Sequence, residues 1–521
     1  MSTTTPSGPA TARTWAGLVV LVIPALLVSM DLSVLFVAAP AISENLQPSA
    51  TQWLWMMDVY GFVLAGLLLT MGALGDRIGR RRLLLIGAVL FGAASALLAF
   101  APTSELFIAG RALLGLAGAS LAPSTLSLIR GMFTDPRQRG KAVGAWTVAF
   151  TGGAVAGPVI GGVLLEFFWW GSVFLINLPF MLLLLAAAPF LVPESRNPRV
   201  SGFDLPGAAL SLVAVLGLVY AAKSLVEHGA DLQSMSALVL GAAFLALFVV
   251  RQRRAADPLI DVSLFTRPAF TAAVSGNTVV AFAVAGMGLL TFTFLQSVHG
   301  LSPLHAALWA LPTFFGTVLG AVAASTAAAR VRPAVLMGGG LLAGAAGFTV
   351  VGMVGMETSL PVFIGGYTVI TLGVGAVATL ANTLVLATAP PERAGAAAGI
   401  SETSTEFGAA LGIAVLGTVS ATVYRSGMAG TEAGPAAAET VTGAVATAPH
   451  LPGPEAAALL DSAFAAYTSG LNTAALTGAA VLTALAVLML VALCRLPAGI
   501  EAPEHGNSDA EEPPGEVPSR V

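Results

Sequence analysis

Apolar residues gather along the chain in runs of about 20 residues, separated by short polar stretches. A helix of about 20 apolar residues, rising about 1.5 Å per residue, crosses the ~30 Å hydrocarbon core of a bilayer. The pattern therefore predicts an all-α integral membrane protein with fourteen transmembrane helices. The expected ranges fall into groups of six, two and six: 15–40, 51–74, 83–101, 106–129, 141–165 and 171–192; 205–222 and 236–250; and 269–296, 303–326, 333–356, 360–386, 394–422 and 469–494.

This grouping divides the chain into three parts. We expect a six-helix bundle at 15–192, a linker at 193–268 that carries the two extra helices, and a second six-helix bundle at 269–496. Residues 1–14 form a short N-terminal segment without a basic stretch or a convincing cleavage site. The first apolar run is therefore expected to stay in the membrane as a helix, and not to be removed as a signal peptide.

Two polar regions of the second half complete the predicted organisation. Residues 423–468, rich in Ala, Gly, Thr and Pro, are expected to form a long external loop, with a short surface helix at 454–468. Residues 497–521 are acidic and contain several prolines. Such a composition is typical of disorder, so this segment is predicted to be a disordered cytoplasmic tail.

Positively charged residues predict the orientation of these helices. Lys and Arg are enriched in cytoplasmic loops, and every second predicted loop is basic here. Of the 23 Lys and Arg residues, all but Lys223, Arg425 and Arg111 fall on the same side of the membrane as the two chain ends. A missing or extra helix would disrupt this alternation. The charge pattern therefore supports an even helix count with both termini in the cytoplasm, in a bacterial-type plasma membrane.

Composition narrows the class of protein. Only 10% of the residues are charged, against about 25% in soluble domains, and the net charge of −4 leaves no basic excess for nucleic acid. The single cysteine excludes a disulfide framework, and the five histidines lack metal-site spacing, so an enzyme is not expected. Neither Lys141 nor Lys223 lies in a phosphate-binding loop. A secondary transporter without a cofactor, driven by an ion gradient, is the predicted class.

Five ionisable residues lie inside the predicted helices, and such residues usually mark transport pathways because they are costly to insert. They are Asp31, Asp58, Arg111, Glu402 and Glu406. Counting about 1.5 Å per residue places Asp31 and Arg111 at similar depth, so an ion pair, direct or through water, is geometrically possible if their helices are neighbours. Protonation would break this pair and thereby act as a conformational switch. The alternative is a purely structural ion pair. Asp58 is either part of the pathway or an acid tolerated at the membrane interface.

Glu402 and Glu406 are four residues apart and therefore share one helix face. Two acids in one dry cavity do not both ionise readily, which suits a proton carrier, and the pair would also attract a lipophilic cation. The alternative is two acids that are hydrogen-bonded to polar neighbours. Aromatic rings that could contact such a cation are Phe36, Trp55 and Tyr60, although aromatic residues in membrane helices more often serve packing.

The segment between the second and third predicted helices carries a recognisable motif. Its glycines allow a tight turn and its arginines anchor the loop on the cytoplasmic side. The spacing of Gly72, Gly75, Asp76, Arg77, Gly79 and Arg80 resembles the G-x-L-x-D-R-x-G-R signature of the major facilitator superfamily. The resemblance implies that Asp76 and Arg77 latch the two halves together. A second copy near Arg330 and Arg332 lacks the Asp, so this role applies only to the first copy.

A second motif lies in the fifth predicted helix. Small residues four apart form a flat stripe for close helix contact, and a proline permits a kink. Packing alone could explain the stripe. The set Gly153, Gly157, Pro158, Gly161 and Gly162 also resembles the G-x-x-x-G-P-x-x-G-G motif of drug:proton antiporters.

Further segments extend the resemblance over nearly the whole chain. They surround Asp31, Trp55, Arg111 and Glu402, although Leu32 and Ser33 stand where the fourteen-helix branch commonly has Thr or Asn. Together they are similar to the fourteen-helix multidrug exporters of the QacA, SmvA and LfrA group. The resemblance implies proton-driven export of quaternary ammonium compounds, dyes such as ethidium and, in some members, fluoroquinolones.

The resulting hypothesis is a proton-coupled exporter whose partners are lipophilic cationic small molecules, protons and the bilayer, with no nucleic acid and no obligate protein partner. One alternative keeps the fold but exports a single natural product or antibiotic. Another is a membrane sensor that binds a ligand without transporting it.

Overall fold

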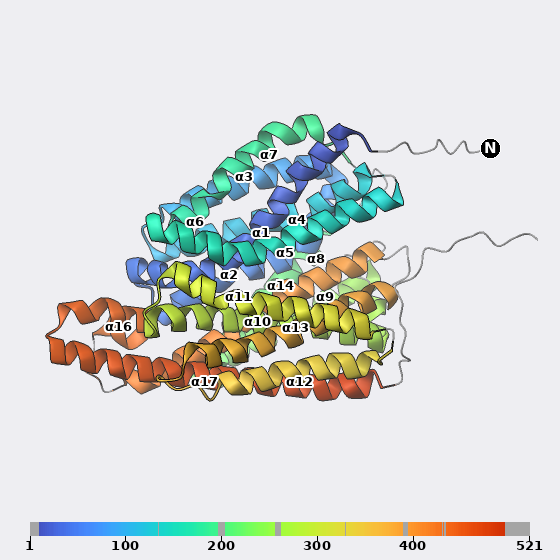
Figure 1. The fold of residues 1–521 in the computed structure, drawn as a ribbon. Coiled ribbons are helices and arrows are strands. Elements are labelled where there is room, and N and C mark those ends of the chain that lie inside the picture. The colour runs from blue at the N-terminus through green and yellow to red at the C-terminus, as the bar shows by residue number, and fades with distance from the viewer. Residues whose placement is uncertain are drawn as a thin grey trace, which may run out of the picture.

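In the computed structural model, described for residues 10–133, 135–195, 204–255, 262–328, 330–388, 394–429, 431 and 434–494, the chain forms helices and turns without a strand. Eleven helices of this part are long and apolar enough to cross a membrane, or twelve if one bent pair is counted as a single span. Two helical bundles lie side by side (Figure 1). The predicted tail 497–521 lies outside the described residues.

The first bundle consists of seven helical segments. Their bounds are α1 Ala12–Leu46, α2 Ala50–Ile78, α3 Arg80–Ala99, α4 Ser104–Met132, α5 Pro136–Phe167, α6 Ser172–Leu175 and α7 Asn177–Leu191. Ser49 and Gln52 form a capping box that begins α2. The inner helix α1 packs against α5, α4 and α7, and α2 packs against α4. These neighbours bring the charged residues of α1, α2 and α4 within reach of each other.

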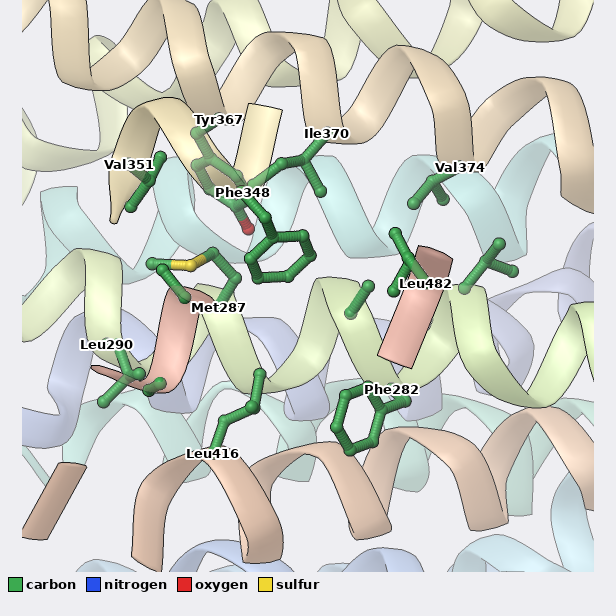
Figure 2. Packing of buried hydrophobic residues seen from close by; sticks show 14 of the residues in the cluster. Phe282, Met287, Leu290, Phe348, Val351, Tyr367, Ile370, Val374, Leu416 and Leu482 are labelled. Carbon is green, nitrogen blue, oxygen red and sulfur yellow. The ribbon is translucent and has the colours of Figure 1, made fainter. Parts of the chain in front are cut away.

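The second bundle has six long helices. They are α10 Pro268–Thr293, which continues through a π-turn at Phe294–Val298, α11 Pro303–Ala327, α12 Pro333–Val351, α13 Leu360–Thr388, α14 Ala394–Met428 and α17 Gly453–Ala492. Figure 2 shows its apolar core, in which Phe348, Ile370 and Leu482 meet from α12, α13 and α17. The two bundles meet where α14 packs against α2 and where α11 packs against α5.

Two linker helices follow the first bundle, and the first of them lies at the seam between the bundles. They are α8 Leu205–His228 and α9 Leu232–Arg254, and α8 packs against α2 of the first bundle and α14 of the second. The Ser211 hydroxyl donates to the Gly66 carbonyl oxygen over 3.3 Å, and Gly66 has no side chain to block the approach of Leu212. One helix from each part of the chain therefore meets at the seam: α2 of the first bundle, α8 of the linker and α14 of the second bundle.

Asp204 fixes the beginning of α8 and the position of α9. Its carboxylate accepts from the Gly207 amide at 2.9 Å and from Arg251 Nε at 2.6 Å. Partial burial favours the neutral acid, but the Gly207 amide, Arg251 and Gln252 outweigh it and leave the pKa of Asp204 below its usual value. The charged carboxylate therefore stabilises the fold at neutral pH.

Replacing Asp204 with Ala is expected to destabilise the protein by about 1 kcal/mol, because α8 loses its N-cap. Because the folded-state pKa is lowered, the stabilisation is complete above the unfolded pKa and is lost as pH falls through the folded pKa. Thermal unfolding in detergent at neutral and acidic pH measures both effects. The difference between wild type and Asp204→Ala should shrink in acid; a constant difference would contradict this assignment.

The predicted loop at 423–468 is largely helical. It contains the end of α14, the short helices α15 Pro435–Glu439 and α16 Val441–Thr447, and the first turns of α17. The predicted short helix at 454–468 is thus the beginning of a helix of 40 residues. Alanine is the strongest helix former and Pro454 is tolerated in the first turn, so this Ala-rich segment continues the membrane helix without a break. The described part of this segment thus contains more helix than the sequence predicted, and its place outside the membrane stays a prediction.

Candidate functional site

The predicted contact between Asp31 and Arg111 is present and direct. Arg111 Nη1 donates to Asp31 Oδ2 at 2.8 Å, and neither side chain is exposed. The pair forms because α1 and α4 are neighbours in the first bundle. Each charge would be costly inside the membrane by itself, so the pair offsets much of the cost of burying both.

Arg111 is also held by α2. Its Nε and Nη2 donate to the carbonyl oxygens of Met56 and Met57 at 3.3 and 3.4 Å, and its guanidinium carbon lies 4.6 Å from the centre of the Tyr60 ring. This approach of α2 and α4 depends on Gly115, where a Cβ atom would lie 2.5 Å from the Tyr60 carbonyl oxygen. The arginine thus links α1, α2 and α4 at one point.

Asp58 follows Met57 on α2 and is 1% exposed. The side chain is thus enclosed by the protein, and its depth in the membrane stays a prediction. Asp58 lies one residue along the chain from a carbonyl that binds Arg111, so it belongs to the same charged region. With Asp31 and Asp58 against Arg111, the buried charged groups of the described first-bundle helices include more acids than bases.

Glu402 and Glu406 lie on α14, in the second bundle. Glu406 is buried and Glu402 is half-buried, and the two carboxylates interact electrostatically. The charges of Glu406, Asp31 and Arg111 all act on the Tyr60 hydroxyl. The close contact of α14 with α2, where Gly61 faces Ala410, places these acids opposite the charged region of the first bundle.

The three predicted aromatic contacts lie in different places. Tyr60 is buried with its ring against Arg111, so that face is already covered by a cation of the protein. Phe36 packs against the apolar cores of both bundles. Trp55 packs at the seam, beside Phe62 on α2 and Ala410 on α14. Phe36 and Trp55 therefore lie where the two bundles meet, and contact of any of the three rings with a substrate stays a prediction.

Two arginines at the end of the loop motif contact α4 of the first bundle and the start of the linker. Arg80 Nη1 donates to the Pro123 carbonyl oxygen at 3.5 Å, and the Arg81 amide donates to Glu194 Oε1 at 2.9 Å. Gly79 has φ of 109°, and a Cβ there would lie 2.8 Å from the Glu194 carboxylate, so glycine is required. Arg77 is exposed, and the Asp76 side chain lies outside the described residues. A latch between the halves stays a prediction.

The glycines of α5 form a close contact with α1, as expected for a flat stripe. A Cβ atom at Gly153, Gly157 or Gly161 would lie within 2.5 Å of an atom of α1, and one at Gly162 would lie 2.8 Å from the Leu304 Cα of α11. The helix is bent by 44° between 138–154 and 156–167, close to Pro158, which provides no amide for a helical hydrogen bond. The motif thus joins both bundles through one bent helix.

Replacing Gly153 with Ala is expected to destabilise the protein by about 1–3 kcal/mol, because the new methyl group would meet the Leu26 carbonyl oxygen at 2.3 Å. Gly152→Ala is the matched control, since no heavy atom of another element lies within 4 Å of its Cβ position. Thermal unfolding in detergent compares the two variants. Equal midpoints would show that α1 and α5 do not pack closely at this point.

A buried polar cluster was missed because the sequence analysis considered only ionisable groups. The Asn277 amide on α10 donates to Asn382 Oδ1 at 3.0 Å and to the Ser401 hydroxyl at 2.7 Å, and Ser401 precedes Glu402. Asparagines inside apolar runs were the available signal. The cluster holds α10, α13 and α14 together beside the two glutamates.

The geometry defines a class of protein: a multi-pass helical membrane protein with two bundles and buried charged residues on α1, α2, α4 and α14. Residues 21–413 match the Major Facilitator Superfamily, and the chain belongs to this family. It is 43% identical to the multidrug efflux pump LfrA of Mycolicibacterium smegmatis, over 95% of this chain and all of that protein. It is 35% identical to the methyl viologen resistance protein SmvA of Salmonella typhimurium, over 93% and 99%.

A solved structure shares the fold. A bacterial homologue of the human lysosomal transporter Spinster superposes with a TM-score of 0.63 at 17% identity, covering 93% of this chain and 98% of that one. The match to the family model and the two relatives confirm the family predicted from the loop and helix motifs. The chain is similar over nearly its full length to drug efflux proteins of this family.

Proposed function

We propose that this protein is a proton-coupled exporter of lipophilic cations that works by alternating access. The relatives support this proposal through their names, one a multidrug efflux pump and the other a resistance protein for methyl viologen, which is a quaternary dication. In this proposal the chain has fourteen transmembrane helices, both termini are cytoplasmic, and the proton motive force of a bacterial plasma membrane is the energy source.

The excess of buried acidic groups is the observation that carries the proposal. Within the described helices, the buried charged side chains are Asp31, Asp58 and Glu406 against Arg111 alone. Such an excess attracts cations, and protonation from outside would remove that attraction. A proton and a lipophilic cation would then compete for the same carboxylates, which is the requirement for exchanging one for the other.

Contacts between the bundles support alternating access. At the end opposite the arginine-rich α2–α3 loop, Gln296 Nε2 donates to the Val37 carbonyl oxygen at 2.9 Å, and the hydroxyls of Ser43 and Thr442 are 2.6 Å apart. The halves are therefore in contact at the proposed external end. Movement of one bundle against the other would have to break these hydrogen bonds before a substrate could leave.

Transport by purified protein in proteoliposomes tests the proposal. An imposed proton gradient, acidic on the side toward which export proceeds, should drive efflux of ethidium and of benzalkonium, and a protonophore should stop it. Efflux that ignores the gradient would contradict proton coupling. Transport of one compound only would favour a dedicated exporter, and binding without flux would favour a sensor.

A further inference from the structure

A buried asparagine of α7 lies beside the Asp31–Arg111 ion pair of the first bundle. Asn177 is the first residue of α7 and is 1% exposed. Its side-chain amide donates to the hydroxyl of Ser95 on α3 at 3.1 Å, and Ser95 is fully buried. α7 also packs against α1, so this amide lies where α1, α3 and α7 meet. A polar group enclosed in this way has to find its partners among neighbouring protein groups.

The hydrogen-bonding capacity of this amide is only partly used by Ser95. The nitrogen of an asparagine side chain carries two hydrogens, and the bond to Ser95 takes one of them. The Asn177 side chain also acts on the Asp31 carboxylate as a hydrogen-bonding neighbour. Arg111 binds Oδ2 of that carboxylate, whereas its Oδ1 is buried and makes no complete hydrogen bond among the described residues. The second N–H of Asn177 is therefore available to the carboxylate oxygen that Arg111 leaves open.

Few ionisable side chains act on Asp31 besides Arg111. The Tyr60 hydroxyl of α2 donates to the Val28 carbonyl oxygen of α1 at 3.5 Å, and the charge of Asp31 acts on this hydroxyl. The helices α6, α7, α10 and α16, which also pack against α1, contain no ionisable residue. Among these groups, Arg111 supplies the opposite charge that acts on Asp31 and Asn177 supplies an uncharged donor. The other ionisable residues of α4, α5 and α11 lie near the helix ends: Glu105, Arg130, Arg137, Arg139, Lys141, Glu166 and His305.

We propose that Asn177 is a positioning residue for Asp31, which holds the carboxylate beside Arg111 and stabilises its ionised form. A hydrogen-bond donor to a carboxylate favours the charged state, so removal of this donor would let Asp31 take up a proton more readily. The inference rests on the proposed export function, in which Asp31 is one of the acids that exchange a proton for a cation. α7, which carries no ionisable residue, would then influence this exchange through one amide.

Carbodiimide labelling tests this role at Asp31 itself. Dicyclohexylcarbodiimide reacts with carboxyl groups in their protonated form, and peptide mass spectrometry reports the modification of Asp31 separately from that of Glu406. The purified full chain in detergent is labelled over a range of pH as wild type and as Asn177→Leu, which keeps a similar side-chain volume and lacks the donor. We expect the pH of half-maximal labelling at Asp31 to rise by about one unit, the size expected for a hydrogen bond to a charged group. The corresponding pH at Glu406 should stay at its wild-type value.

Two further variants separate the amide of Asn177 from the packing around it. Asn472→Leu is the matched control, because it removes a half-buried amide of α17 whose nitrogen donates to the Val354 carbonyl oxygen at 2.9 Å. It should leave the labelling of Asp31 unchanged. Ser95→Ala removes the other partner of the Asn177 amide and keeps the donor, so its shift should be smaller than that of Asn177→Leu. Equal shifts in these two variants would overturn the proposal, since they would show that the contact between α3 and α7, and not the amide, affects Asp31.

The fold of each variant is checked by thermal unfolding in detergent. Asn177→Ala, which removes the same donor and adds no volume, replaces Asn177→Leu if the leucine cannot be accommodated. An unchanged pH of half-maximal labelling at Asp31 in the folded variant would overturn the proposal. The labelling needs neither a proton gradient nor a substrate, so the expected shift together with absent proton-driven efflux would contradict the proposed function and not the role of Asn177.

Discussion

Replacing Arg111 with methionine is expected to destabilise the protein by about 3–5 kcal/mol and to abolish gradient-driven efflux. The substitution leaves the buried Asp31 carboxylate without the guanidinium that lies 2.8 Å away, and removal of one partner from a buried ion pair has a cost of this size. It also removes the hydrogen bonds to Met56 and Met57, which join α4 to α2. Thermal unfolding in detergent and ethidium efflux from proteoliposomes measure the two losses.

The double variant Asp31→Leu/Arg111→Met separates structure from transport. An apolar pair of similar volume often restores the stability lost by a single substitution, because no charge remains to be buried. We therefore expect near wild-type unfolding and no proton-driven efflux. Efflux by the double variant would show that the pair is purely structural. Arg111→Lys is the conservative control: it keeps the charge but loses the fork of donors, so it should fall between wild type and Arg111→Met.

Residue counting in the sequence placed Asp31 and Arg111 at similar depth, but it left open whether their helices are neighbours and whether the contact is direct. The same arithmetic could not reveal that Met56, Met57 and Tyr60 surround the arginine, since this depends on which face of α2 turns toward α4. That choice is made by Gly115, whose missing side chain allows the two backbones to approach. A motif in one helix predicts its own flat face, but not the helix that will lie against it.

The external end illustrates a different limit. Residues 453–468 lack the continuous apolar character of a membrane helix, so the sequence predicted only a short surface helix at 454–468, whereas helix propensity joins this segment to the membrane helix in α17. A cavity at this end is lined by Trp53, Tyr424 and Glu439, among other residues. It was not predictable, because these residues come from distant parts of the chain. Each residue alone resembles an ordinary residue of a membrane surface. Only the packing of α2, α14 and α17 brings them together.

Replacing Glu406 with glutamine is expected to reduce proton-driven efflux by about tenfold or more. Coupling between two ligands, here the proton and the cation, typically changes binding by about 5- to 150-fold, and the expected loss lies in this range. Glu406 is 5% exposed, and its Oε2 has no hydrogen-bond partner among the described residues. A buried carboxylate of this kind can exchange a proton for a cation, whereas the amide of glutamine keeps the shape and cannot. The fold should therefore remain while exchange is lost.

Proton release measures this exchange directly. When tetraphenylphosphonium is added to purified wild-type protein in weakly buffered detergent, the displaced proton should acidify the solution; with Glu406→Gln the signal should fall. Glu166→Gln is the matched control, because Glu166 lies exposed at the end of α5, and both its efflux and its proton release should equal wild type. Undiminished proton release from Glu406→Gln would show that another carboxylate exchanges the proton. The candidates are Glu402, one turn away on α14, and Asp58 in the first bundle. Glu402→Gln and Asp58→Asn would then distinguish an exchange site on the second bundle from one on the first.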